Sequence, residues 1–259
     1  MATYLDRILS AHRAAANADT RPVDQLLRAA QQCSTPVRGF AACLREAEGL
    51  AVVAEIKRRS PVKGDLRPDL VAEVMAKAYA DGGATCLSVV TDNQFFGGSA
   101  ADLTDARAAT SLPVLRKDFT IGPADVCDAR LMGADAVLLI VAALSPPELT
   151  QLAELARRLE LDALVEVHDE AELEVALNAG ATLVGVNQRD LVTFEVDPAR
   201  AESVGAAIPA GVVRVAESGI RGPDDARRLA DAGYHAVLVG ESLVRASDPA
   251  AAVAALRGR

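Results

Sequence analysis

The sequence is poor in aromatic residues: its 259 residues include no tryptophan, three tyrosines and five phenylalanines. The four cysteines lie far apart with no C-x-x-C pair, which indicates neither a zinc site nor a disulfide framework and favours a reducing compartment. The longest apolar run, Ala136–Leu144, falls short of the roughly 20 residues that a membrane-spanning helix needs. Met1–Ile8 contains no apolar signal-peptide core. These absences predict a cytoplasmic protein that does not enter a membrane.

Positive charge is also in short supply, because 27 lysines and arginines face 36 aspartates and glutamates. The resulting net charge of −9 argues against binding to nucleic acid or to an anionic membrane. An anionic small molecule can still bind where basic side chains gather locally. About half of the residues (51%) are hydrophobic, mostly Ala, Leu and Val, which suits helices around buried parallel strands.

A glycine followed by a short apolar strand recurs four times, at intervals of about 50 residues. Glycine at these points suits a helix C-cap with positive φ. Helical patterns fill the gaps; the clearest, Pro146–Leu159, follows Ser145 and has Glu148 in capping-box position. The glycines are Gly83, Gly133, Gly180 and Gly233, and the strand-like runs between the copies are Ala51–Ile56, Pro113–Arg116, Ala163–Val167 and Val212–Ala216.

Four such double units predict eight strands and eight helices, and this even repetition favours a (β/α)8 TIM barrel over an open doubly wound sheet. Before the first strand, residues 3–32 carry apolar side chains at helical spacing, and a connector that can form a helical turn follows over Cys33–Gly49. We therefore expect an N-terminal helical extension (1–50) packed on a barrel (51–259). Because no linker rich in Pro, Gly or Ser separates them, the two parts are predicted to form a single domain overall.

The first strand ends with an acid and a base on one face. Side chains alternate along a strand, so Glu55 and Lys57 point the same way. This pair is either a structural ion pair or part of a wet cavity, since unpaired buried charge is costly. A basic loop follows over 58–64, and its composition suits closure over an anion.

Polar side chains end several other strands, and in a TIM barrel all these ends share one mouth. Lys117, Glu166, Asn187 and Glu217 are expected to meet there with Glu55 and Lys57. The two ammonium groups of Lys57 and Lys117 and the two carboxylates of Glu55 and Glu166, in a partly dry cleft, are suited to proton transfer. On the opposite side, Ser218-Gly219 and Gly240-Glu241 can offer backbone N–H groups to a phosphate, with Glu241 using its N–H because its carboxylate would repel the anion.

Three features of the mouth have more than one interpretation. Lys117 is either a proton donor or the amine of a Schiff base. The Phe95-Phe96 pair is either loop packing or a platform for an aromatic ring. His168 is interpreted as a helix-start or rim residue, because Asp169 after it resembles an N-cap. No carboxylate or histidine cluster has metal-ligand spacing.

The strand-end motifs, taken in order, resemble those of the indole-3-glycerol phosphate synthase family of tryptophan biosynthesis. They are E-I-K-R-R-S-P, S-V-V-T-D with F-F-G-G-S, L-P-V-L-R-K-D-F, L-V-E-V-H, G-V-N-Q-R-D-L, A-E-S-G-I and V-G-E-S-L. The match runs from about Ala51 to Leu243, and the helical leader is also typical of the family. The chain resembles the monofunctional bacterial form.

This resemblance implies conversion of 1-(2-carboxyphenylamino)-1-deoxyribulose 5-phosphate to indole-3-glycerol phosphate, CO2 and water, without metal or organic cofactor. Lys117 would be the general acid for ring closure. Lys57 would be a second acid that can hold the substrate carboxylate, assisted by Glu55. Glu166 would act as the base, or as the negative charge that stabilises a positive nitrogen.

The same resemblance implies the remaining site residues. Asn187 is expected to fix Glu55 and the sugar hydroxyls, with Arg189 supporting it, while Glu217 and Ser218 complete the catalytic rim. The expected substrate-binding residues are Ser60, Phe96, Arg189, Gly219, Gly240 and Glu241. The protein is expected to be a monomer that binds a phosphorylated anionic small molecule. Transient contacts with neighbouring enzymes of the pathway are also expected. Two alternatives remain: a Schiff-base aldolase acting on sugar phosphates, and a non-catalytic barrel that binds biosynthetic enzymes.

Overall fold

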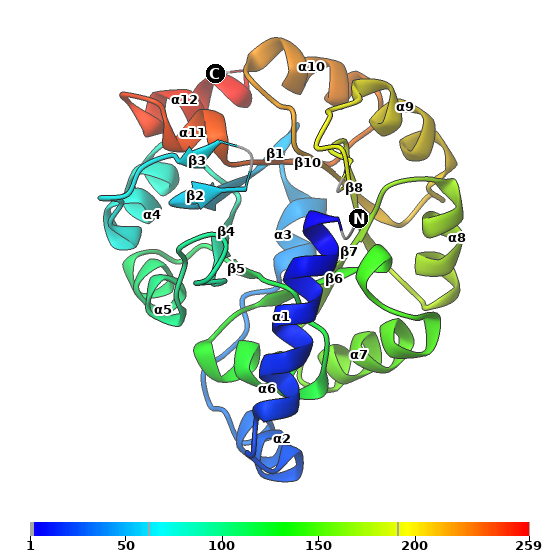
Figure 1. Cartoon of the computed structure of the whole chain (residues 1–259). Coiled ribbons are helices and arrows are strands. Elements are labelled where there is room, and N and C mark those ends of the chain that lie inside the picture. The colour runs from blue at the N-terminus through cyan, green and yellow to red at the C-terminus, as the bar shows by residue number, and fades with distance from the viewer. Residues whose placement is uncertain (1–2, 62, 191, 259) are drawn as a thin grey trace.

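A closed parallel barrel forms the centre of the molecule in the computed structural model, which describes residues 3–61, 63–190 and 192–258 (Figure 1). Around the barrel the strands follow the order β1-β10-β9-β8-β7-β6-β5-β4, and β4 pairs with β1. This confirms the predicted (β/α)8 TIM barrel. The barrel strands in the described residues are β1 (Ala51–Ile56), β4 (Cys86–Val90), β5 (Val114–Lys117), β6 (Ala136–Ile140), β7 (Asp162–Val167), β8 (Leu183–Asn187), β9 (Val213–Glu217) and β10 (Ala236–Val239).

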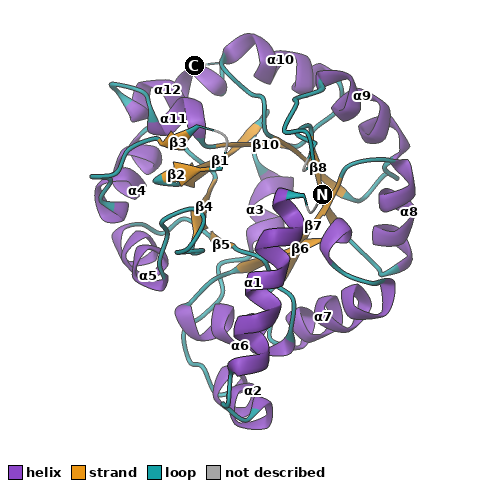
Figure 2. Cartoon of the chain, viewed as in Figure 1, coloured by secondary structure: helices purple, strands orange, loops and turns teal. Residues whose placement is uncertain are grey.

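Helices surround the strands on all sides (Figure 2). The capping box predicted at Ser145 is present, with Glu148 accepting from the Ser145 backbone N–H at 2.7 Å. The four repeated glycines all have φ between 83° and 86°, as a left-handed helix end requires. The helices around the barrel are α4 (Ala72–Asp81), α5 (Ala100–Ala109), α6 (Pro123–Met132), α7 (Pro146–Arg158), α8 (Glu170–Asn178), α9 (Pro198–Ala207), α10 (Pro223–Asp231) and α12 (Pro249–Leu256), with short turns η1 (Val141–Ala143) and α11 (Glu241–Val244).

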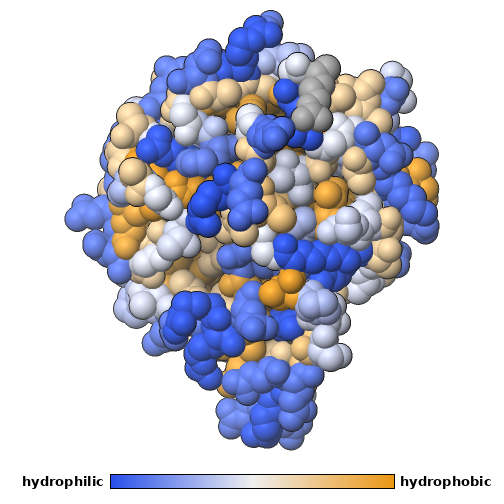
Figure 3. Space-filling view, turned by 180° about the vertical axis from the view of Figure 1, so that it is seen from behind, coloured by the Kyte–Doolittle hydropathy of each residue, from blue (hydrophilic) through white to orange (hydrophobic). Residues whose placement is uncertain are grey.

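Burial of both faces of the strands accounts for their apolar sequences. Every residue of β1, β4, β6 and β10 is buried, Glu55 included. The face turned away from the viewer in Figure 1 is largely hydrophilic, with small hydrophobic areas scattered among polar ones (Figure 3). No described helix combines the length and apolarity needed to cross a bilayer.

Of the three described helices before β1, the first and the third cover the two ends of the barrel and the second lies beside it. Helix α1 (Tyr4–Ala18) crosses the mouth of the barrel (Figure 1). A hydrogen bond holds it there, donated by Arg13 Nη2 to Ala143 O at 3.1 Å. Helix α2 (Val23–Gln31) packs against α6. Helix α3 (Phe40–Glu46) lies at the opposite end, where the Ala41 N–H donates to Asp162 at the start of β7 at 2.8 Å. The sequence predicted only a possible helical turn in this last segment.

The basic loop after β1 contains a short hairpin, β2 (Arg59–Ser60) with β3 (Gly64–Asp65). Arg58, expected to help close over an anion, points instead toward α5 and forms a two-pronged ion pair with Asp102, at 2.5 and 2.7 Å. Its guanidinium is thereby neutralised away from the mouth. Val62, within the predicted loop, lies outside the described residues.

Candidate active site

A cavity of about 500 Å³ opens at the C-terminal ends of the barrel strands. Apolar side chains form its floor, among them Leu138, Ile140 and Leu238, so polar groups at the rim face a partly dry space. All of the predicted site residues line this cavity: Glu55, Lys57, Ser60, Phe96, Lys117, Glu166, Asn187, Arg189, Glu217, Ser218, Gly219, Gly240 and Glu241.

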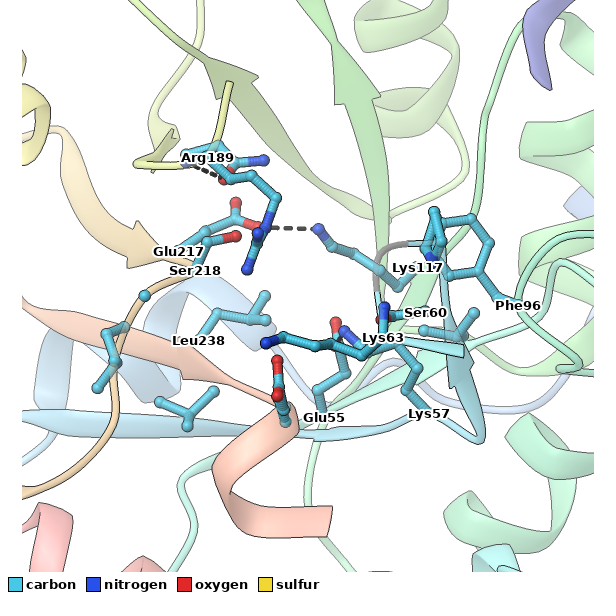
Figure 4. Close-up of a pocket in the computed structure, with 18 of the residues that line it drawn as sticks. Glu55, Lys57, Ser60, Lys63, Phe96, Lys117, Arg189, Glu217, Ser218 and Leu238 are labelled. Atoms are coloured by element: carbon cyan, nitrogen blue, oxygen red, sulfur yellow. Dashed lines mark hydrogen bonds and ion pairs between the residues drawn. The ribbon is translucent and has the colours of Figure 1, made fainter. Parts of the chain in front are cut away.

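Lys117, the last residue of β5, holds the centre of the site (Figure 4). Its Nζ donates to Glu217 Oε2 at 2.8 Å and to Glu166 Oε2 at 3.2 Å. Burial acts to lower the pKa of Lys117, but the carboxylates of Glu217, Glu166 and Glu55 outweigh it and raise the pKa above the usual lysine value. Lys117 is therefore held as an ammonium group with a proton to donate.

Burial affects the pKa of Glu217 more than its contact with Lys117 does. Burial and the neighbouring carboxylates of Glu166 and Glu55 raise its pKa to about 7, although Lys117 favours its ionised form. One ammonium group shared among several carboxylates cannot fully compensate each of them. Glu217 Oε1 is buried without a hydrogen-bond partner among the described residues. A Cβ on Gly185 of the adjacent β8 would collide with this oxygen, so glycine there makes room for it.

Glu55 and Lys57 form a close pair at the end of β1, with 2.5 Å between Lys57 Nζ and Glu55 Oε1. Burial acts to raise the pKa of Glu55, but Lys57 and Lys117 bring it below the usual value. A Cβ on Gly240 would collide with Glu55 Oε1. The two residues form an ion pair and also line the cavity, so both interpretations of the pair, as an ion pair and as part of a cavity, are correct.

Asn187 contacts a different carboxylate from the one predicted. Its Nδ2 donates to Glu166 Oε1 at 3.0 Å, not to Glu55, because β8 lies next to β7 and far around the barrel from β1. Its Oδ1 accepts from the Arg189 backbone N–H at 3.0 Å. Burial acts to raise the pKa of Glu166, yet Lys117, His168 and Asn187 hold it below its usual value.

The loops after β9 and β10 form the side of the cavity expected to bind phosphate. Ser218 and Gly219 both have positive φ, 65° and 72°, which turns successive backbone groups into one concave loop. Ser242 Oγ donates to Ile220 O at 3.1 Å and links the two loops. Three basic side chains that were not predicted as site residues also line the cavity: Lys63, Arg221 and Arg245. Their proximity in sequence to Ser60, Gly219 and Glu241 was the available signal.

The two neighbouring phenylalanines separate. Phe96 lines the cavity with Phe119, their ring centroids 6.3 Å apart. Phe95 packs edge-on against Tyr4 of α1, with 6.0 Å between ring centroids, and Phe194 also packs edge-on against Tyr4, at 5.5 Å. Loop packing thus describes Phe95, whereas Phe96 is the member of the pair that lines the cavity.

One group of three potential metal ligands comes together within the described residues, His12 with Asp92 and Asp118. His12 Nε2 lies 2.9 Å from Asp92 Oδ2, while the other Asp92 oxygen accepts backbone N–H groups at 2.7 and 3.0 Å. Asp118 pairs with Arg116 at 3.1 Å. Because these oxygens already have donors, the group fits a fastening between α1 and the mouth better than a metal centre.

Comparison with known proteins shows that the chain is similar to one protein family. A family model described as indole-3-glycerol phosphate synthase matches residues 5–256. The chain is 52% identical over 223 residues to indole-3-glycerol phosphate synthase 2 of Streptomyces coelicolor, covering 86% of each chain. It is 48% identical over 255 residues to indole-3-glycerol phosphate synthase of Mycobacteroides abscessus, covering 98% of this chain and 93% of that one.

Among solved structures, similarity to thiamine phosphate pyrophosphorylase from Pyrococcus furiosus has a TM-score of 0.62 at 20% identity, over 81% of this chain and 94% of that one. An N-acetylmannosamine-6-phosphate 2-epimerase from Clostridium perfringens gives 0.61 at 15% identity, over 77% and 89%. At these identities the likeness concerns the fold alone.

Proposed function

The chain belongs to the indole-3-glycerol phosphate synthase family, and from that premise we propose how its barrel mouth carries out the reaction. The activity is that of the family: a decarboxylating carbon–carbon lyase reaction of tryptophan biosynthesis that yields indole-3-glycerol phosphate. The substrate, 1-(2-carboxyphenylamino)-1-deoxyribulose 5-phosphate, is a phosphorylated small molecule. Its ring closure, decarboxylation and dehydration are divided among the charged side chains of the cavity.

Lys117 is the general acid for ring closure. As the ring carbon that bears the carboxylate attacks the sugar carbonyl, Lys117 passes a proton to the carbonyl oxygen. The observation that carries this assignment is its position between Glu217 and Glu166, which keeps the amine protonated. A Schiff base needs a neutral amine, so the same contacts argue against the aldolase alternative. Glu217, with a pKa of about 7, is placed to return a proton to Lys117.

Decarboxylation and dehydration involve the other charged groups. Lys57 holds the substrate carboxylate until CO2 leaves, and Glu55 orients Lys57 through their close contact. The hydroxyl formed by ring closure then departs as water after it accepts a proton, with Lys57 as the acid. Glu166 faces the positive charge that develops on the ring nitrogen and takes up the proton whose loss completes the indole. Asn187 keeps the Glu166 carboxylate in place.

Substrate recognition divides between two sides of the cavity. The backbone N–H groups of the Ser218-Gly219 and Gly240-Glu241 loops bind the phosphate, and Arg221 and Arg245 add positive charge nearby. Phe96 lies beside the anthranilate ring. On the β1 side, Ser60 and Lys63 border the cavity, and Arg189 borders it beside Asn187 (Figure 4).

Turnover followed by indole fluorescence tests this scheme. Lys117→Met should lower kcat by about 100-fold or more, the size of a general-acid contribution, and leave the circular dichroism spectrum unchanged. Lys77→Met, at an exposed lysine on α4 paired with Glu73, is the matched control and should retain full activity. Near-normal kcat in Lys117→Met would exclude the assignment. Absence of turnover in the unmodified protein would favour the non-catalytic barrel.

We also infer a cytoplasmic monomer that has at most transient contacts with neighbouring pathway enzymes. The described cysteines are all free, which agrees with a reducing compartment. Helices α1 and α3 cover both ends of the barrel, so extension and barrel should unfold as a single domain. Sedimentation at several concentrations and one thermal unfolding transition would support these inferences.

A further inference from the structure

His168 lies directly behind Glu166, on the side away from Lys117. It follows the last residue of β7, Val167, and strand alternation returns its side chain to the face of Glu166. The imidazole is 11% exposed. The sequence interpretation as a rim residue therefore omits its contact with the site.

Glu172 fixes the imidazole from outside. One carboxylate oxygen, Oε2, accepts the His168 backbone N–H at 2.8 Å and lies 2.9 Å from the ring nitrogen Nδ1. A carboxylate only accepts, so Nδ1 carries a proton and the ring orientation is set. Glu172 is held in turn by Asp169, the N-cap of α8, whose side chain accepts the Glu172 backbone N–H at 2.8 Å.

The other ring nitrogen faces the active site. Nε2 lies 3.5 Å from Glu166 Oε1 and has no hydrogen-bond partner in the described parts of the chain. With Nδ1 protonated, a neutral ring would turn a lone pair toward this carboxylate, whereas an imidazolium turns an N–H. Burial acts to lower the pKa of His168 and so does Arg200 on α9, but Glu172 and Glu166 outweigh them and raise it. The charged ring is thus favoured.

We propose that His168 is a positioning residue for Glu166, holding its Oε1 together with Asn187 so that Oε2 stays turned toward Lys117 and the substrate. When Lys117 gives its proton away, Glu166 loses the positive charge at Oε2. His168 keeps a positive charge behind Oε1, which maintains Glu166 as an anion for the later steps. This inference rests on the role proposed above for Glu166.

Proton NMR titration tests the contact without substrate. The chain has three histidines, so the imidazole signals can be assigned by substitution. In Glu166→Gln the pKa of His168 should fall, because the facing anion is gone. His235, whose Nδ1 accepts the Arg214 backbone N–H at the other end of the barrel, is the internal control and should titrate unchanged. An unchanged His168 titration in Glu166→Gln would overturn the proposal.

Kinetics tests the consequence. His168→Leu should lower kcat by between about tenfold and about 100-fold, the effect of a misplaced functional group, with little change in KM. His168→Gln should recover much of the loss, because its amide N–H can still reach Glu166, and His235→Asn should behave as the unmodified enzyme. A purely structural role would lower stability without this recovery.

The outcomes separate the two proposals. Full activity of His168→Leu beside an inactive Glu166→Gln would overturn the role of His168 alone. Full activity of Glu166→Gln would remove the role of Glu166 and this inference with it. If His168→Leu does not fold, the titration of His168 in Glu166→Gln still tests the contact. A higher kcat in His168→Gln than in His168→Ala would then support the positioning role, and equal kcat values would overturn it.

Discussion

Glu217 should make the protein less stable as the pH rises, and its isosteric replacement should reverse this. The usual pKa of a glutamic acid is 4.5, and burial with neighbouring carboxylates raises that of Glu217 to about 7 in the folded protein. The folded state then binds its proton more tightly than the unfolded state does. The stabilising contribution of this proton is complete below pH 4.5 and is lost as the pH rises through 7.

The size of the effect depends on the difference between the two pKa values. Each pKa unit corresponds to about 1.4 kcal/mol, so ionising Glu217 in the fold costs about 3 kcal/mol of unfolding free energy at pH 8. Glu217→Gln resembles the protonated acid and has no charge to bury. We expect it to be about 3 kcal/mol more stable than the unmodified protein at pH 8, about 6 to 12 °C in Tm, and within about 1 kcal/mol of it at pH 5.

Thermal unfolding at pH 5 and pH 8 measures both differences, and the fluorescence assay should show lower kcat for Glu217→Gln at the same time. Glu174→Gln, at an exposed position on α8, is the matched control and should change Tm equally at both pH values. The reasoning is refuted if Glu217→Gln is destabilised at pH 8, because the Lys117 contact would then outweigh the burial of charge.

Two glycine substitutions give further predictions. Gly240→Ala puts a Cβ against Glu55 and should lower kcat about tenfold or more by displacing the Glu55 carboxylate. Gly222→Ala, whose Cβ meets nothing within 4 Å, is the control and should keep the kcat of the unmodified protein. Equal kcat in both variants would contradict the packing argument. Gly219→Asp brings a carboxylate to the expected phosphate loop, and its Cβ collides with Val196 at a φ of 72°. KM should therefore rise at least about tenfold. If calorimetry shows unchanged affinity for the product, the phosphate binds elsewhere.

The sequence was sufficient for features that depend on one strand or one helix end. Alternation along β1 places Glu55 and Lys57 together, and the glycine repeat predicts the barrel. Contacts between side chains on strands that are not neighbours in the barrel could not be predicted from the sequence. Lys117 and Glu217 are 100 residues apart on strands that do not pair, so only the closed barrel makes Glu217 a direct partner of the general acid.

Loop residues were harder to predict because composition does not fix direction. Arg58 and Lys63 belong to one basic loop, yet Arg58 turns to Asp102 while Lys63 lines the cavity. Phe95 and Phe96 are adjacent and face different surroundings. In each case the deciding factor is a partner that lies far along the chain.

The path of α1 over the barrel mouth bears on how the protein is best handled for kinetics. Tyr4 touches the loops that carry Phe95 and Phe194, and Phe194 itself lines the cavity. An affinity tag fused ahead of Tyr4 would start beside the substrate entrance. Helix α12 packs instead against α4 and α10 on the outside of the barrel, at the edge of the molecule in Figure 1. Purification tags and immobilisation linkers therefore belong after α12, where they leave the entrance free.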